Sequence, residues 1–326
     1  PEYQTEWWYY TGNVQARDGQ ELGFQLTFFR RGLDPEPVAR ASRWATQNIY
    51  LAHFTVTDIS GERFYAAERF SRDGAHLAGA TGEPYHVFIE DWQATGSGPE
   101  GMTMHLRAQA KDMAIDLELR NDKAPTLQGD RGYSVKGAGV GNASYYYSLT
   151  RMDTTGKVTV NGNAFPIVAG ASWMDHEWGT SRLESDGVGW DWFALQLDDG
   201  RELTWAQIRR ADGTANPASF GKLTAADGST TPLRATDIEL EVTKSWNSPR
   251  SGARYPAAWQ LRVPQAGLNL TITPRVADQE LPVSIVYWEG AVAIQGTTGA
   301  TAEPVTGRGY VELTGYVPNG ERVPGR

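Results

Sequence analysis

One short segment combines residue types that can carry out acid–base chemistry beside aromatic rings. It spans residues 171–179 and reads ASWMDHEWG. Successive side chains of a β-strand point to opposite faces, so a strand here sends His176 and Trp178 to one face. Asp175 and Glu177 then point to the other face. We expect His176 and Trp178 to line one common cavity; the alternative is a core His bonded to a carboxylate, with Trp as packing.

A second candidate is Asp191, which lies between Trp190 and Trp192. In a strand over residues 190–197, Asp191 shares its face with three apolar residues, Phe193, Leu195 and Leu197. A carboxylic acid on an apolar face loses hydration of its charged form, which raises its pKa and lets it hold a proton near neutrality. The alternative is a charge at a strand end that stays in water. We therefore predict Asp191 as a proton donor.

Several aromatic and polar positions are candidates for contacting a substrate wherever they line a cavity. They occur in the aromatic clusters EWWYY at residues 6–10 and YYY at 145–147, in the apolar strand around residue 53, and beside Asp191. Their alternative role is to fill the core. The predicted substrate-binding residues are Trp8, Tyr10, His53, Tyr146, Trp190 and Trp192.

Other catalytic patterns are missing from the sequence. No nucleophile elbow, phosphate-binding loop or HExxH zinc helix occurs. None of the five His residues lies within three to five positions of another, and the chain has no Cys. Zinc sites usually combine closely spaced His and Cys ligands. We therefore predict no metal site.

Strand signals dominate the elements that must position these residues. Segments 48–57 and 192–197 are rich in aromatic, aliphatic and β-branched residues. Turn dipeptides such as Asp18-Gly19 and Asp199-Gly200 recur at hairpin spacing, and the 326-residue chain contains 36 Gly and 17 Pro. The composition and turn spacing predict an all-β protein.

An internal repeat predicts two related domains. DGQEL at 18–22 matches DGREL at 199–203, and an aromatic cluster precedes each copy. Trp92 and the hairpin at 106–117 then match Trp246 and the hairpin at 261–272, in the same order. Duplication of a unit of about eight short strands favours two closed or nearly closed antiparallel barrels, since closure removes exposed strand edges. We expect domains at 1–182 and 183–326, with the two hairpins in equivalent places and a ligand near the junction.

Charge and hydropathy exclude two classes of partner. The net charge is −9 and the basic residues are scattered, whereas a phosphate backbone requires a positive stripe. No stretch approaches the roughly 18 consecutive apolar residues of a membrane-spanning helix. The predicted partner is a small molecule, with neither nucleic acid nor a transmembrane segment involved.

Longer motifs resemble the carotenoid 1,2-hydratase-like family, also described as predicted secreted hydrolases or lipocalin-like proteins. The matching segments cover both halves: TEWWYYTGN at 5–13, residues 47–54, MDHEWG at 174–179, YWEGAV at 287–292 and GYVELTGY at 309–316. The resemblance implies two tandem lipocalin-like barrels. It also implies a periplasmic or secreted location, although a cytoplasmic one stays open.

The resemblance also implies chemistry on bulky apolar molecules. Hydratases of this family add water to prenyl-type double bonds, and their His-x-Trp pair maps onto His176 and Trp178. Their acidic residue maps onto Asp191, at a shorter spacing and without the Tyr-x-Asp form. A protonated Asp would supply the proton, aromatic faces would stabilise a carbocation, and His176 would position or deprotonate water.

The leading interpretation is therefore a cofactor-independent enzyme that hydrates, or carries out a related hydrolase or lyase step on, a hydrophobic molecule such as an isoprenoid. Two alternatives remain, since one fold supports many functions. One is a lipocalin-like carrier of an apolar ligand, which needs no proton-transfer pair. The other is a cyclase of the Diels–Alder type that works by shape.

Overall fold

The structure, a computed structural model, describes residues 3–36, 41–98, 103–137, 139, 141–180 and 187–317. The chain forms two compact units. The first comprises Pro1–Pro125 and Ser144–Thr180, and the second comprises Thr126–Ala143 and Ser181–Arg326. The predicted boundary between residues 182 and 183 lies outside the described residues.

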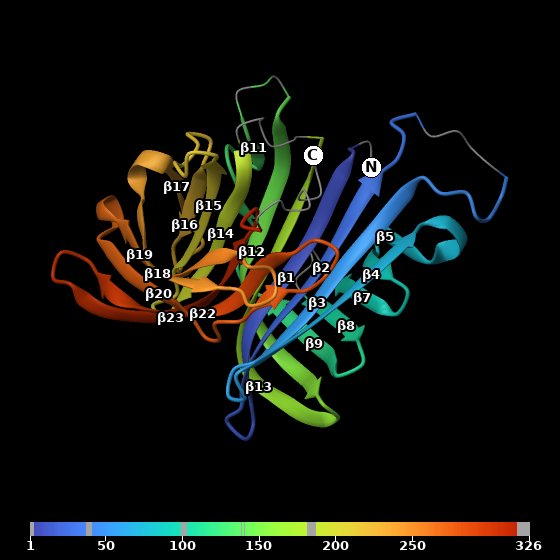
Figure 1. Ribbon diagram of the computed structural model, residues 1–326, viewed down its shortest axis with the longest axis horizontal. Coiled ribbons are helices and arrows are strands. Elements are labelled where there is room, and N and C mark those ends of the chain that lie inside the picture. Colours follow the sequence, from blue (N-terminus) through green and yellow to red (C-terminus); the bar gives the residue numbers. More distant parts are fainter. Residues whose placement is uncertain are drawn as a thin grey trace. The chain divides into compact units, whose positions relative to one another are not determined.

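The first unit is one curled antiparallel sheet (Figure 1). In spatial order its main path consists of β4 (Arg63–Arg72), β3 (Asn48–Asp58), β2 (Glu21–Gly32), β1 (Thr5–Ala16), β13 (Asn163–Gly179), β12 (Ala143–Val160), β9 (Met113–Asn121), β8 (Thr103–Gln109), β7 (Trp92–Ser97), β6 (Tyr85–Ile89) and β5 (Ala78–Gly82). A single 3-10 turn, η1 (Gly74–His76), lies between β4 and β5.

Apolar side chains on the inner face hold this sheet in its curl. Phe54 of β3 meets Trp92 of β7 with 5.6 Å between ring centroids, and the Tyr10 hydroxyl of β1 hydrogen-bonds that of Tyr85 on β6. Burial of such large aromatic residues contributes strongly to core stability. Across the core, β3 therefore faces β7 and β1 faces β6, although these strands are far apart in the sheet order.

The second unit is another curled antiparallel sheet (Figure 1). Its main path runs through β17 (Thr230–Arg234), β16 (Phe220–Thr224), β15 (Glu202–Arg210), β14 (Gly187–Leu197), β23 (Glu303–Leu313), β22 (Tyr287–Thr298), β20 (Leu268–Pro274), β19 (Arg254–Val263) and β18 (Glu239–Asn247). The short elements of this unit include β21 (Glu280–Leu281), η3 (Ala235–Asp237) and η4 (Pro264–Ala266). Its segment Thr126–Ala143 contributes β10 (Thr126–Leu127) and β11 (Tyr133–Val135), which are not strands of this sheet. Phe193 and Trp259 meet in the core of the second unit, with 5.5 Å between ring centroids.

Side-chain contacts explain why the segment Thr126–Ala143 belongs to the second unit. Lys222 of β16 donates hydrogen bonds to the carbonyls of Leu127 and Gly129. The Gln128 amide donates to the Thr204 hydroxyl at 3.1 Å. The predicted ranges place this segment in the first domain, since nothing in its local pattern indicates those contacts.

The all-β class and the two tandem antiparallel barrel domains are confirmed, since each unit is a curled sheet that forms a barrel or half-barrel. The predicted equivalence of the hairpins is also confirmed. The order β1-β13-β12-β9-β8-β7 in the first unit corresponds to β14-β23-β22-β20-β19-β18 in the second. The turns at Gly19 and Gly200 also correspond, and both have the positive φ that glycine accommodates most easily.

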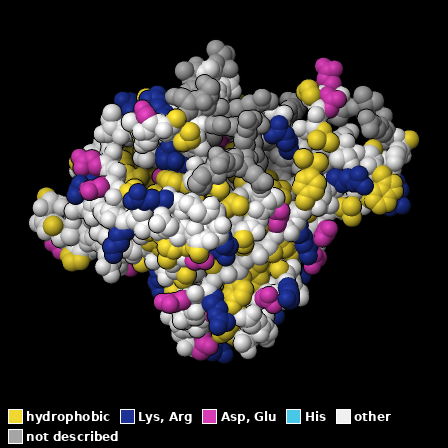
Figure 2. Space-filling view, viewed as in Figure 1, with side chains coloured by type: hydrophobic (Ala, Val, Ile, Leu, Met, Phe, Trp, Pro, Cys, Tyr) yellow, Lys and Arg dark blue, Asp and Glu magenta, His cyan; other side chains and the backbone are white. Residues whose placement is uncertain are grey.

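The described residues show how charge is distributed on the surface and whether any helix could cross a membrane. Figure 2 shows Lys and Arg side chains interspersed with Asp and Glu side chains on the visible face, as the scattered charges of the sequence suggest. Within the described part of the chain, the structure contains no helix long and apolar enough to cross a membrane.

Candidate functional site

The strand β13 presents its residues as the alternation predicts. Met174 is fully buried in the core of the first unit, and His176 and Trp178 share its face. Asp175, on the opposite face, instead accepts hydrogen bonds from the Tyr146 and Ser148 hydroxyls. This confirms that Asp175 points away from His176, while a common cavity for His176 and Trp178 stays a prediction.

Strand pairing brings a carboxylate to His176. In the β1–β13 ladder, Trp8 lies opposite His176 and Glu6 lies opposite Trp178, so all four side chains face inward. The His176 Nε2 atom lies 2.9 Å from Glu6 Oε1, and Nδ1 lies 3.3 Å from the Tyr147 hydroxyl. His176 is thus held between a carboxylate and a phenol.

His176 and Arg30 of β2 together favour the ionised form of Glu6. The Arg30 Nε atom donates to Glu6 Oε2 at 2.9 Å, and both side chains are more than nine-tenths buried. Burial raises the pKa of Glu6, but the hydrogen bonds and charges of His176 and Arg30 outweigh burial, so the pKa lies below its usual range. An ionised Glu6 can only accept, so Nε2 of His176 carries a proton; whenever the ring is neutral, Nδ1 is then the acceptor.

Aromatic rings surround the imidazole. Trp8 stacks on His176 with 5.3 Å between centroids and 18° between planes, and Trp178 lies 4.6 Å away. The side chain of His176 keeps 15% of its surface exposed, which makes the ring accessible. Indole faces attract cations and are poor nucleophiles, so this site can stabilise positive charge without trapping it.

Tyrosine hydroxyls supply further donors on the inner face. Burial raises the pKa of Tyr50 and of Tyr147 to about 12, and it also raises the pKa of Tyr10 and Tyr85. The charge of Glu6 adds to this effect at Tyr50, Tyr85 and Tyr147. These phenols therefore stay protonated near neutrality and can orient a polar substrate group or a water molecule.

Asp191 lies in the second unit, on the inner face of β14, with its own partners. Arg209 Nε donates to its Oδ1 at 2.8 Å, and the Tyr316 hydroxyl lies 3.0 Å from each carboxylate oxygen. Burial raises the pKa of Asp191, whereas the charge of Arg209 and the bond from Tyr316 lower it. Asp191 belongs to the second unit, whereas His176 belongs to the first. The role of Asp191 as a proton donor stays a prediction.

The other predicted substrate-binding residues divide between faces and units. Trp8 and Tyr10 are on the inner face of the first unit. His53 and Tyr146 point the opposite way from the core residues beside them in β3 and β12. The His53 ring is hydrogen-bonded to Glu68 at 3.0 Å, and the Tyr146 hydroxyl donates to Asp175.

The two predicted residues of the second unit, Trp190 and Trp192, flank Asp191 in β14, and the indole of Trp190 donates to Glu312.

Sequence reasoning missed three residues that contact the imidazole or its carboxylate. Glu6 and Tyr147 lie in the aromatic clusters at 6–10 and 145–147, from which only Trp8, Tyr10 and Tyr146 are predicted as substrate contacts. Arg30 lies near the end of β2 and belongs to no motif. A signal was available for Glu6: in a strand, a carboxylate two positions before Trp8 must share its inward face. No sequence signal indicated which strand would lie beside it.

Asp175 forms a buried polar cluster on the other face of β13. Its oxygens accept from Ser148 at 2.5 Å, Trp173 at 2.8 Å and Tyr146 at 2.9 Å. Burial raises the pKa of Asp175 from 3.8 to about 7; these hydrogen bonds oppose the shift and the charge of Glu177 adds to it. The folded protein therefore binds a proton here that the unfolded chain releases.

This cluster predicts a pH-dependent stability. The raised pKa favours the folded state at low pH, so the free energy of unfolding should fall as pH rises from 3.8 to about 7 and then level off. Asp175→Asn keeps the shape and removes the ionisation, so its stability should vary less across this range. Denaturant unfolding at pH 5, 6, 7 and 8 measures both proteins. Equal pH dependence of the two would contradict the assignment.

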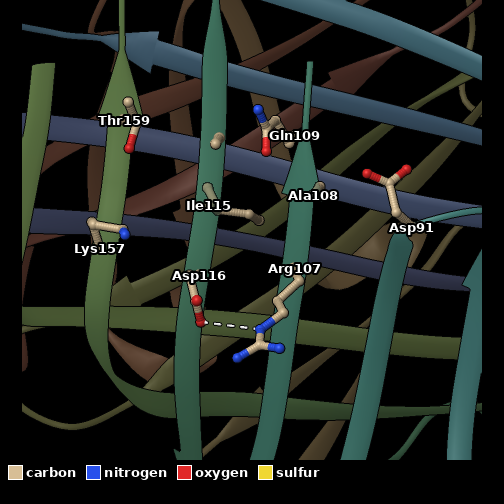
Figure 3. A pocket seen from close by; sticks show the side chains of 9 residues that line it. Asp91, Arg107, Ala108, Gln109, Ile115, Asp116, Lys157 and Thr159 are labelled. Carbon is tan, nitrogen blue, oxygen red and sulfur yellow. Dashed lines mark hydrogen bonds and ion pairs between the residues drawn. The ribbon is translucent and has the colours of Figure 1, made fainter. Parts of the chain in front are cut away.

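A separate open groove of about 390 Å³ lies on the first unit, and its lining includes residues of β8, β9 and β12. Figure 3 shows Arg107 beside Asp116, with Lys157 and Thr159 on the next strand. Asp116 accepts from Arg107 at 3.5 Å and lies 2.6 Å from His105 Nε2. The lining of the groove mixes polar and apolar side chains and does not include His176 or Trp178. Among the described residues, no group of three or more His, Asp and Glu side chains is arranged to hold a metal ion.

The fold and the site together define a tandem lipocalin-like barrel protein with a His–carboxylate pair inside its first barrel. The family model described as AttH-like matches residues 1–316, and the chain belongs to this family. This confirms the family resemblance of the motifs. No curated protein matches the chain in sequence.

Solved structures share the same architecture. A protein from Nitrosomonas europaea assigned to AttH is 32% identical, with a TM-score of 0.83 over 97% of this chain and 94% of that chain. Kievitone hydratase from Nectria haematococca is 16% identical, with a TM-score of 0.74 over 95% of this chain and 89% of its own. CghA is 14% identical, with a TM-score of 0.59 over 97% and 89%. The last two similarities concern the fold.

Proposed function

We propose that the inner site of the first unit is the active site of a cofactor-independent enzyme. Its reaction is the hydration of a bulky apolar molecule such as an isoprenoid, or a related hydrolase or lyase step. The observation that carries the proposal is the partly exposed His176, fixed between ionised Glu6 and the Tyr147 hydroxyl and flanked by Trp8 and Trp178.

The arrangement supports each part of an alkene hydration. A proton adds to one carbon of the double bond and leaves a tertiary carbocation on the other. The oxygen of a water molecule then bonds to the cation, and His176 Nδ1 accepts the proton that this water loses. Glu6 stabilises the imidazolium so formed, in the same way that a carboxylate supports a catalytic His in other acid–base sites.

Protonated His176 supplies the first proton within this site, and it regains a proton from water at the end of the cycle. The indole faces of Trp8 and Trp178 lower the energy of the cation, and they bind an apolar substrate by removing its surface from water. Asp191, the donor predicted from the sequence, lies in the second unit, and its role stays a prediction.

The proposal draws its support from the site, and the fold shared with kievitone hydratase and CghA is compatible with it. A carrier would use the aromatic walls without needing a charged His–Glu–Arg arrangement. Burying Glu6 and Arg30 has a desolvation cost that core packing alone does not require. This cost favours an enzyme over a carrier.

The test is a panel of prenylated substrates incubated with the wild type in water labelled with heavy oxygen. Hydration is shown by one labelled hydroxyl per product molecule, detected by mass spectrometry. Quenching of tryptophan fluorescence reports binding in parallel. In Glu6→Gln, turnover should fall by about two to four orders of magnitude while binding changes little. Tight binding without turnover by the wild type would favour the carrier, and an unlabelled cyclic product would favour the cyclase.

A further inference from the structure

We propose that Arg30 is a positioning residue for this acid–base pair, holding the Glu6 carboxylate so that it fixes a single tautomer of His176. The inference rests on the proposed function, because Arg30 affects catalysis only through His176 and Glu6. Arg30 itself does not contact the imidazole in the described structure; its guanidinium bonds lie on the far side of Glu6.

Every nitrogen of the Arg30 guanidinium has a fixed partner. Nε donates to Glu6 at 2.9 Å, Nη1 donates to the Asn48 side chain at 2.8 Å, and Nη2 donates to the Tyr3 carbonyl at 2.8 Å. Arg30 is only 2% exposed. A planar guanidinium with three fixed partners cannot swing, so it presents Nε to Glu6 in one direction.

A second layer holds Asn48 in turn. The side-chain Nδ2 of Asn48 donates to Asp73 Oδ2 at 2.8 Å, and the backbone N–H of Asn48 donates to the same oxygen at 3.0 Å. The side-chain oxygen of Asn48 is therefore turned toward Arg30, since its nitrogen is committed to Asp73. The connected chain runs from Asp73 through Asn48, Arg30 and Glu6 to His176.

This chain has two physical consequences for the site. The Arg30 charge favours the ionised form of Glu6, which must then accept the Nε2–H of His176. Arg30 also occupies Oε2 and leaves Oε1 for the imidazole. The other titratable groups that face Glu6 are Tyr50, Tyr85 and Tyr147, from β3, β6 and β12, and all three stay protonated near neutrality.

The test uses NMR of the full chain and requires no substrate. Arg30→Met removes the charge and keeps an apolar side chain of similar length. The pKa of Glu6, followed by its carboxyl carbon signal, should rise by about one to three units, the usual effect of removing a nearby opposite charge. The ring-nitrogen signals of His176 should change from one neutral tautomer to a mixture.

Arg31→Met is the matched control, since Arg31 is the next residue of β2 and points to the opposite face; both signals should stay as in the wild type. Asn48→Ala covers the case in which Arg30→Met does not fold. It loosens Arg30 without removing its charge, and the same changes should appear to a smaller extent. An unchanged pKa of Glu6 and a single His176 tautomer in the folded variants would overturn the inference.

These experiments distinguish a failure of the positioning role of Arg30 from a failure of the proposed enzyme function. Unchanged spectra in Arg30→Met, with turnover that still requires His176, would remove Arg30 from the site and leave the proposed enzyme intact. Shifted spectra in a protein that turns over no substrate would contradict the proposed function, although the coupling of Arg30 to Glu6 would stand. A KM that stays constant while kcat falls in Arg30→Lys would support positioning over substrate binding.

Discussion

Turnover of a prenylated substrate should fall by about two to four orders of magnitude in His176→Gln, which is the usual contribution of general acid–base catalysis. Gln retains a donor for Glu6 but cannot accept a proton from water at neutral pH. Binding of the apolar substrate should change less than about threefold, since the indoles of Trp8 and Trp178 remain in place and hydrophobic contact supplies the affinity. Steady-state kinetics and fluorescence titration on the same preparation measure both quantities.

His86→Gln is the matched control for this substitution. His86 of β6 is on the outer face of the first unit, 3.1 Å from Gln93 Oε1 and stacked on Phe88. Its replacement should leave turnover unchanged. Wild-type turnover in His176→Gln would remove this residue from the mechanism and return it to a packing role.

The second large effect concerns stability. Asp191→Asn should lower the free energy of unfolding by about 3 kcal/mol, because it leaves Arg209 mostly buried without its counter-charge. This loss is near the low end of the range for broken buried ion pairs, since 12% of the Arg209 side-chain surface is exposed. Arg209 also retains its hydrogen bond to the Thr314 carbonyl. Denaturant unfolding followed by tryptophan fluorescence measures the loss. Asp130→Asn, which affects an exposed pair with Arg131, should cost less than about 1 kcal/mol.

The same variant decides the role of Asp191. If Asp191 donates the proton to the alkene, turnover per folded molecule should fall by about two to four orders of magnitude, as for other general acids. If the pair with Arg209 serves only the second barrel, turnover per folded molecule stays at the wild-type level while stability falls. Full turnover together with full stability would contradict both roles.

The sequence alone determined the features that depend on local periodicity. Alternation with a period of two placed His176 and Trp178 on one face of β13, and turn dipeptides bounded the strands. The ordered repeats indicated two related barrels, which the matching strand orders confirm. The motifs were long enough to identify the family, since they extend over both halves of the chain.

Only the tertiary structure decided which residues share a site. Glu6 lies 170 positions from His176 in the chain, and the pairing of β1 with β13 makes them neighbours. Tyr316 lies 125 positions from Asp191, and its hydroxyl bonds the carboxylate that the sequence presented as a free acid. Local patterns fix which face a side chain occupies. The partner across the sheet depends on strand order and register, which arise when distant segments pair and bury a common core.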